Sequence, residues 1–190
     1  SASSRGAGYN RLMDDGQAAQ ELDRRLDGWT PDLVGPLLFL VVDSRVLLIR
    51  KRRGHGVGKI NGPGGKLEPG ETPAACAVRE TLEETGVRAE APRLAAVFRF
   101  VDTCQPDWLG YIFTAGACTG SPRTTAEGIP RWYDTTALPL DEMWDDDRYW
   151  LPRVLAGERL RGDFLFTDGR LRAHRIRPVP DDDVLRPEPP

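Results

Sequence analysis

The sequence predicts an α/β protein in which helices pack on a mixed β-sheet. Short apolar runs alternate along the chain with segments of helical periodicity, and glycine or proline separates most of them. The chain has 190 residues, of which 39% are hydrophobic, enough for a core without disulfide bonds. These observations favour one layered domain with additional segments at its ends.

Three segments are expected to be helical. Apolar residues at four-residue spacing predict a helix over residues 14–27, which a glycine ends. Residues 73–85 predict a second helix, because Thr72 is a good N-cap and Gly86 supplies a left-handed stop. A third helix is expected over residues 145–157.

Apolar runs predict the strands between these helices. Residues 35–52 predict two strands joined by a tight turn at Asp43-Ser44, and the Asp168-Gly169 pair predicts a hairpin over residues 163–179. The other expected segments are a glycine-rich basic loop at 52–65, strands at 94–101 and 108–117, a loop at 120–130 and a strand end at 131–134.

Composition excludes several classes of protein. The net charge of −3 argues against a broad basic surface, so no nucleic-acid polymer is expected as a partner. Three widely spaced cysteines, Cys76, Cys104 and Cys118, argue against a disulfide framework and favour reduced thiols. The longest apolar run, residues 36–42, is too short to span a membrane, and the first residues hold no apolar signal core. We therefore expect a cytoplasmic protein without a membrane partner, most simply a monomer.

The second predicted helix carries several glutamates on one side. At about 100° per residue, Glu80, Glu83 and Glu84 fall within one arc of the helix surface. Three like charges on one face repel each other, so solvent or a positive ligand must compensate them. The residues expected on the opposite face, packed on the sheet, are Ala75, Val78 and Leu82.

Two interpretations of this acidic face remain open: a solvated surface or a cation site. Clustered carboxylates without His or Cys suit Mg²⁺ or Mn²⁺, which proteins commonly share with substrate phosphates. The preceding glycine-rich loop lets the backbone approach closely, and nearby basic side chains offer positive charge to phosphate oxygens. These basic residues are Lys51, Arg52, Arg53, Lys59 and Lys66.

One motif combines the glycine loop with the acidic helix. Its positions are Gly65, Glu71, Arg79-Glu80, Glu83-Glu84, Gly86 and Val87. This spacing resembles the Nudix box, whose many fixed positions make chance a poor explanation. The box has an aliphatic residue after Arg-Glu, where this chain has Thr81, and we expect that change to concern packing rather than activity.

The resemblance implies a fold, a reaction and a set of ligands. The fold would be the Nudix α/β/α sandwich, and the reaction a metal-dependent hydrolysis of a nucleoside diphosphate linked to another moiety. Glu71 and Arg79 would form an ion pair that holds the loop to the helix. The residues it assigns to the metal are Gly64, through its carbonyl, and the catalytic candidates Glu80, Glu83, Glu84 and Glu127. For Glu127, a plain loop acid is the alternative.

Outside the box, the chain resembles the MutT-type branch that acts on oxidised purine nucleoside triphosphates. The similarity is carried by "RVLLIRKRRGHGVGKINGPGGK" and "EMWDDDRYWLPRVLAGERLRGDFLF". It implies that Asn61, Asp146 and Asp147 read the purine edge, because amide and carboxyl groups match its donors and acceptors. Trp144 would stack on the base. The remaining substrate-binding candidates are Lys51, Lys66, Phe98 and Phe166.

Several of these residues have structural alternatives. Trp144 and Trp150 are also typical of core packing, and the run from Asp145 to Asp147 is typical of a capped helix start. His55 stands where this branch has another aromatic residue, and no role is assigned to it or to His174.

Three functions are compatible with these motifs. The first is cleavage of an oxidised purine nucleoside triphosphate such as 8-oxo-dGTP to the monophosphate and pyrophosphate, which sanitises the nucleotide pool. The second is Nudix hydrolysis of ADP-ribose or a dinucleoside polyphosphate; Asp102 and Thr103 stand where ADP-ribose enzymes have a proline. The third is a nucleotide-sensing module that binds without cleaving, which the intact set of box glutamates disfavours.

The expected organisation has four parts. Residues 1–13 would form a flexible arm and residues 14–33 a helical extension. Residues 34–178 would form the Nudix hydrolase domain, and the proline-rich, acidic residues 179–190 a disordered tail. The expected partners are a small nucleotide and Mg²⁺ or Mn²⁺.

Overall fold

A computed structural model of the chain describes residues 15–180 and residue 185, and it confirms the predicted α/β class. The helices are α1 (Asp15–Leu26), α2 (Pro73–Thr85) and α3 (Asp147–Leu155), with a 3₁₀ turn η1 at Leu140–Glu142. The strands are β1 (Leu33–Val42), β2 (Arg45–Lys51), β3 (Ile60–Asn61), β4 (Val87–Glu90), β5 (Arg93–Asp102), β6 (Trp108–Ala115), β7 (Ala117–Gly120), β8 (Gly128–Asp134), β9 (Leu160–Thr167) and β10 (Arg170–Pro178).

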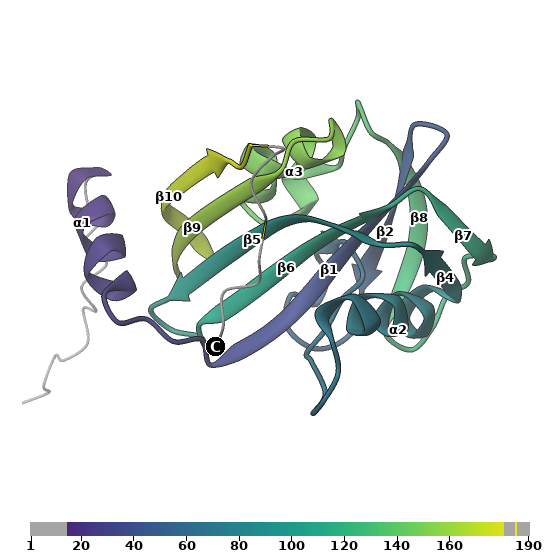
Figure 1. Cartoon of the computed structure of the whole chain (residues 1–190), viewed down its shortest axis with the longest axis horizontal. Helices are drawn as coiled ribbons and strands as arrows, with labels where there is room; N and C mark the ends of the chain where they lie inside the picture. The colour runs from purple at the N-terminus through teal and green to yellow at the C-terminus, as the bar shows by residue number, and fades with distance from the viewer. Residues whose placement is uncertain (1–14, 181–184, 186–190) are drawn as a thin grey trace, which may run out of the picture.

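A mixed eight-stranded sheet forms the centre of the protein (Figure 1). Its strands follow the order β10-β9-β5-β6-β1-β2-β3, and β8 also pairs with β2. The β1–β6 and β5–β9 pairs are parallel and the other pairs are antiparallel. Strands β4 and β7 form a separate two-stranded ribbon beside α2.

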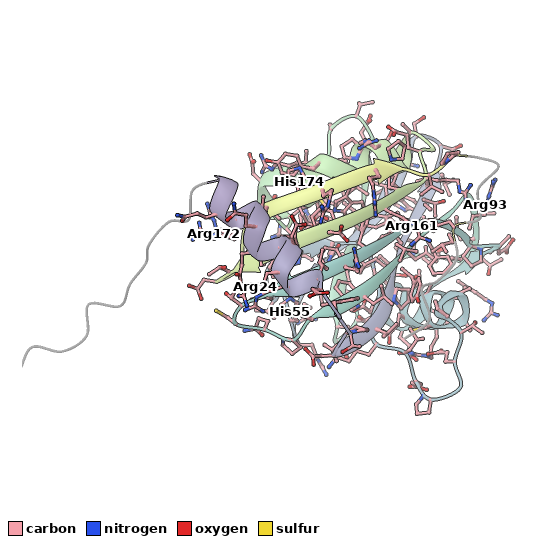
Figure 2. All side chains as sticks on the ribbon, turned by 60° about the vertical axis from the view of Figure 1, so that its left-hand side comes forward. Arg24, His55, Arg93, Arg161, Arg172 and His174 are labelled. Atoms are coloured by element: carbon pink, nitrogen blue, oxygen red, sulfur yellow. The ribbon has the colours of Figure 1, made fainter. Side chains whose placement is uncertain are left out.

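Helices cover both faces of this sheet, as an α/β/α sandwich requires. Alternation along β1 sends Leu37 and Phe39 to the core under α3, and Leu38 and Leu40 to the core under α2. Helix α1 packs on the same face as α2 but farther along the sheet, where Leu22 contacts a small cluster with strands β5 and β9. Figure 2 shows α1 in front of the sheet, with Arg24 on the helix and His174 on β10.

Helix α2 begins and ends where the sequence predicts. The Thr72 hydroxyl accepts a hydrogen bond from the Ala75 amide at 3.2 Å, and Gly86 adopts the left-handed conformation with φ 78°. Thr81 is buried, and its hydroxyl donates to the Ala77 carbonyl at 2.7 Å. The threonine therefore fits the packing position of the motif without leaving a polar group unsatisfied.

The predicted orientation of α2 is wrong. Ala75 and Leu82 are exposed and Val78 is only half-buried, whereas Glu84 is buried. The residues that α2 buries are Cys76, Ala77, Thr81, Glu84 and Thr85. The helix turns one glutamate inward because backbone and lysine donors from other segments satisfy that carboxylate there, so polar contacts replace part of the expected apolar packing.

The turns were predicted better than the short strands. Asp43 and Ser44 have φ of 50° and 59°, and Asp168 and Gly169 have φ of 51° and 70°, as two-residue hairpin turns require. The expected strand at 108–117 breaks at Gly116 into β6 and β7. Strands β3 and β4 were not predicted, because runs of two to four residues carry little periodicity.

The tail prediction does not hold for the part of the tail that the structure describes. Val179 and Leu185 are buried and pack into the core under α2. The Val179 amide also donates to the Arg159 carbonyl at 2.7 Å. The rest of the predicted tail and the predicted arm at residues 1–13 lie outside the described residues. Among the described helices, none has the length and apolar character needed to cross a membrane.

Candidate active site

A cavity of about 440 Å³ lies between the glycine-rich loop, the end of β5 and the start of α3. That volume suits a small-molecule ligand. It is lined by the predicted site residues Lys51, Asn61, Gly64, Lys66, Trp144, Asp146, Asp147 and Phe166. Residues from separate segments of the sequence therefore meet around one hollow.

Two buried aspartates form one wall of this cavity. Asp146 accepts a hydrogen bond from Trp150 Nε1 at 2.8 Å, and Asp147 accepts one from the Trp144 amide at 3.0 Å. Asp146 occupies the N-cap position of α3, but its side chain makes no capping hydrogen bond. The third acid of the run, Asp145, instead accepts from the Leu171 amide at 3.2 Å. The run is therefore more than a capped helix start.

The carboxyl groups of this pair are held in an environment that favours a proton. Burial raises the pKa of Asp146 to about 6, and the Trp150 hydrogen bond only partly opposes this. Burial, and then the negative charge of Asp146, raise the pKa of Asp147 well above its usual range. Near neutral pH the pair can thus offer a protonated donor beside an ionised acceptor.

Phe98 does not line the cavity, contrary to its predicted role. Its ring lies in the core, with centroids 5.0 Å from Trp150 and 5.2 Å from Phe164. Phe100, two residues along the same strand face, lines the cavity instead. Trp150, which does line the cavity, packs against Phe98, so the residue predicted to wall the pocket belongs instead to the core behind that wall.

The surroundings of Trp144 also include residues that the sequence did not assign. The His55 ring stacks on Trp144 with centroids 4.9 Å apart and planes 13° apart. Lys59 Nζ lies 5.1 Å from the Trp144 ring centroid and donates to the Met143 carbonyl at 3.1 Å. The glycine-rich loop therefore holds the indole in place. The signal for this in the sequence was His55, which stands where related proteins have another aromatic residue.

The other end of the cavity meets the acidic helix at Glu84. Its carboxylate accepts hydrogen bonds from Lys51 Nζ at 3.1 Å and from the Gly64 amide at 2.9 Å. Burial raises the pKa of Glu84, and the Lys51 ammonium and the Gly64 amide oppose that shift. Glu84 thereby joins α2 to two segments that line the cavity.

Glu80 lies beside Glu84 on the same face of α2 and touches the glycine loop. A Cβ added to Gly65 would lie 2.4 Å from the carboxyl carbon of Glu80, so glycine is needed for this approach. Arg79 donates to Glu80 at 2.7 Å and to Glu83 at 3.3 Å. Glu80 and Glu84 thus stand close to the glycine loop, whereas Glu83, whose side chain is 55% exposed, pairs with Arg79.

The donor types at this end fit a hard divalent cation. They are carboxylates that meet a loop where glycine leaves room for close approach, which suits Mg²⁺ or Mn²⁺ better than softer metals. In the part of the chain that the structure describes, no three acidic, histidine or cysteine side chains already form a closed metal cluster. Lys51 and Arg79 instead neutralise Glu84 and Glu80.

The predicted position of Glu127 is only partly supported by the geometry. Its carboxylate lies 3.4 Å from Arg53, and its side chain is 42% exposed. The Thr125 hydroxyl, two residues earlier, donates to the Glu84 carbonyl at 3.0 Å. The loop therefore reaches α2, but the structure does not bring the Glu127 carboxylate into a cluster with the helix glutamates.

The Glu71–Arg79 pair holds the glycine loop to α2. Arg79 donates to the two carboxylate oxygens of Glu71, from Nε at 2.9 Å and from Nη2 at 2.9 Å. This fork lowers the pKa of Glu71 to about 2. The structure thus contains the ion pair that the motif implies.

Replacing Glu71 by glutamine is expected to destabilise the fold by about 1–2 kcal/mol at neutral pH. Because the folded pKa is lowered from 4.5 to about 2, this contribution is present above pH 4.5 and disappears as the pH falls towards 2. Thermal unfolding of the variant and the parent across this range measures it. Glu68→Gln, an exposed neighbour in the same loop, is the control. A stability difference that does not depend on pH would contradict the assignment.

Known proteins share sequence and fold with this chain. The NUDIX domain family matches residues 34–154. The chain is 35% identical to the oxidized purine nucleoside triphosphate hydrolase of Mus musculus, over 70% of this chain and 85% of the relative. It is 37% identical to the enzyme of the same name from Danio rerio, over 68% of this chain and 84% of the relative.

A solved structure shows the same fold. The MutT protein from Bacillus halodurans superposes with a TM-score of 0.68 and 30% identity, over 78% of this chain and 99% of that protein. The family match includes the glycine loop, α2 and most of α3, which together surround the cavity and carry the helix glutamates. The chain therefore belongs to the Nudix family of hydrolases.

Proposed function

We propose that this protein hydrolyses oxidised purine nucleoside triphosphates, such as 8-oxo-dGTP, to the monophosphate and pyrophosphate. The observation that carries the proposal is the pair of buried aspartates beside Trp144, in the cavity that also reaches Lys51 and the acidic helix. The names of the mouse and zebrafish relatives support the same substrate class.

The two ends of the cavity have different tasks in this proposal. Trp144 stacks on the base, while Asn61, Asp146 and Asp147 pair with its edge and Phe166 closes the pocket. At the other end, Lys51 and Lys66 neutralise the triphosphate. The distance between the two ends is spanned by the nucleotide, so base recognition positions the phosphates for attack.

The metal is proposed to bind where α2 meets the glycine loop. Glu80, Glu83 and Glu84 would hold Mg²⁺ or Mn²⁺, with the Gly64 carbonyl and Glu127 as further ligands. When bound, the divalent ion supplies charge neutralisation at the phosphates and acidity to water. The glutamates themselves orient that water and accept its proton. Arg79 keeps the helix and loop in register for this task.

A hydrolysis screen tests the proposal directly. Oxidised and unmodified purine triphosphates, ADP-ribose and a dinucleoside polyphosphate are compared with Mg²⁺ and with Mn²⁺, and kcat/KM is measured for each. We expect the highest value for an oxidised purine triphosphate. Preference for ADP-ribose or the dinucleoside would assign another Nudix activity, and tight binding without turnover would indicate a sensing module.

Hydrolysis in oxygen-18 water is expected to place the label in pyrophosphate. Water oxygen forms a bond to the β-phosphorus, the bond from that phosphorus to the α,β-bridging oxygen breaks, and the monophosphate leaves with the bridging oxygen. The proton of the water passes to a carboxylate and then to solvent. Mass spectrometry of both products measures the outcome, and label in the monophosphate would contradict attack at the β-phosphorus.

The working state is also part of the proposal. We propose a monomer in the reducing cytoplasm, and the free thiols of Cys76, Cys104 and Cys118 support the reducing compartment. Light scattering at working concentration measures the mass in solution.

A further inference from the structure

The extension, residues 15–33, precedes the family match and is hydrogen-bonded to Asp107, which lies in the loop between β5 and β6. The Asp107 carbonyl accepts hydrogen bonds from the Asp32 and Leu33 amides, both at 3.0 Å. The Asp107 amide donates to Asp32 Oδ2 at 2.8 Å, and Asp107 Oδ2 accepts from Trp29 Nε1 at 2.8 Å. Four hydrogen bonds therefore join this one residue to the extension.

The remaining carboxylate oxygen of Asp107 closes its own loop. Oδ1 accepts from the Asp102 amide at 3.0 Å. Asp102 Oδ1 in turn accepts from the Cys104 amide at 2.7 Å and the Gln105 amide at 3.1 Å. From the extension, Arg25 also donates to the Asp102 carbonyl at 3.4 Å. Both ends of the loop are thus fixed to residues of α1 and of the connection to β1, which run beside the loop in Figure 1.

This loop forms part of the cavity wall. Asp102, Gln105, Pro106 and the adjacent Trp108 line the cavity, as does Leu33 from the extension side. A loop of this kind, rich in exposed backbone, has little apolar packing of its own to hold it in one conformation. The loop is also held by its own Asp102 hydrogen bonds and by the Thr103 amide, which donates to the Phe166 carbonyl at 3.1 Å. The four hydrogen bonds between Asp107 and the extension add to this order at the other end of the loop.

We infer that the extension is a built-in brace of the substrate cavity, in which Trp29 and Asp32 are positioning residues that hold Asp107 and the β5–β6 loop in the binding conformation. When the free protein already holds this loop in one conformation, no binding energy is spent on ordering the loop as the substrate binds. The brace acts on substrate affinity and not on the phosphate chemistry, which takes place at the far end of the cavity on α2. The inference rests on the proposed function only for its kinetic readout.

Trp29→Phe removes the indole donor to Asp107 and keeps most of the ring packing. We expect KM to rise about three- to tenfold, with kcat within about twofold of the parent. Asp107→Asn gives a second test, because its uncharged amide keeps the shape but places a donor against either Trp29 Nε1 or the Asp102 amide. Asp23→Asn is the matched control: it breaks the 2.8 Å ion pair between α1 and Arg175 without touching the loop.

Hydrogen–deuterium exchange provides a readout that does not depend on turnover. Amides of residues 102–107 should exchange faster in Trp29→Phe and Asp107→Asn and at the parental rate in Asp23→Asn. A KM within twofold of the parent in both loop variants would overturn the brace, as would an equal rise in the control. If the parent cleaves no nucleotide, the proposed function fails, and unchanged exchange in both variants then overturns the brace separately.

Discussion

Replacing Glu84 by glutamine is expected to lower kcat by about 10²- to 10³-fold while leaving the fold intact. The Glu84 carboxylate faces two donors, Lys51 Nζ and the Gly64 amide. Glutamine keeps the volume of the side chain but removes its charge, and its amide offers one acceptor where two are needed. The charge that would hold a catalytic cation is therefore lost without opening a cavity in the core.

The experiment compares kcat, its dependence on Mg²⁺ concentration and the melting temperature of Glu84→Gln with those of the parent. Glu90→Gln, an exposed glutamate on β4, is the control for loss of one negative charge. A Glu84→Gln enzyme that turns over at a near-parental rate would remove Glu84 from the catalytic set. Because one buried donor loses its acceptor, the melting temperature should fall by a few degrees, and a variant that does not fold would instead indicate a structural role.

The pH dependence of stability gives an independent check on the burial of Glu84. Burial raises its folded pKa above 4.5, so the folded state binds this proton more tightly than the unfolded chain. The stabilising contribution is complete below pH 4.5 and is lost as the pH rises through the folded pKa. In metal-free solution, the parent should therefore lose stability relative to Glu84→Gln as the pH rises above 4.5, and a constant difference would contradict this.

Much of helix α2, which carries the proposed catalytic glutamates, could be predicted because its signals are local. Thr72 and Gly86 mark its ends, and fixed spacing is enough to place Glu80 and Glu84 on one face. Spacing cannot say which face turns inward. That choice depends on Lys51 and on the Gly64 amide, which are far from Glu84 in sequence and satisfy its carboxylate only in the folded chain.

The cavity walls depended on contacts that no local pattern contains. Strand alternation put Phe98 and Phe100 on the same face, but the position of Trp150 decides which ring is covered. The bond between Trp29 and Asp107 joins residues 78 positions apart, and neither one belongs to a recognisable motif. Family motifs therefore located the proposed catalytic residues, while long-range pairing shaped the pocket beside them.

The aspartates proposed to read the base, Asp146 and Asp147, should show the second large effect. Asp147→Asn and Asp146→Asn are expected to lower kcat/KM for 8-oxo-dGTP by about ten- to a hundredfold, and for dGTP much less. Asparagine can still accept from the Trp144 amide or from Trp150 Nε1, so the structural hydrogen bonds survive. What is lost is the shared proton, which lets one acid donate to the oxidised base while the other accepts from it.

The raised pKa values set the direction of the pH dependence. Because the pKa of Asp146 is about 6 and the pKa of Asp147 is also raised, the pair keeps a proton to higher pH than ordinary aspartates, whose pKa is 3.8. The preference for the oxidised base should therefore weaken as the pH rises through these values, and the Asn variants should lack that dependence. Folding stability should change in the same direction, because the folded state binds these protons more tightly than the unfolded chain. The parent should therefore lose stability relative to the variants as the pH rises from about 4.

Both substrates are measured for each variant between acid and alkaline pH, at saturating Mg²⁺. Asp141→Asn is the control for loss of one negative charge nearby, because Asp141 is exposed, pairs with Arg148 and does not line the cavity. Its preference should equal that of the parent, and the Mg²⁺ dependence should be the same in every variant, since none of these residues touches the α2 glutamates. If the preference for the oxidised base survives both Asp146→Asn and Asp147→Asn, these aspartates serve only to anchor the tryptophans, and the base is recognised by another part of the wall.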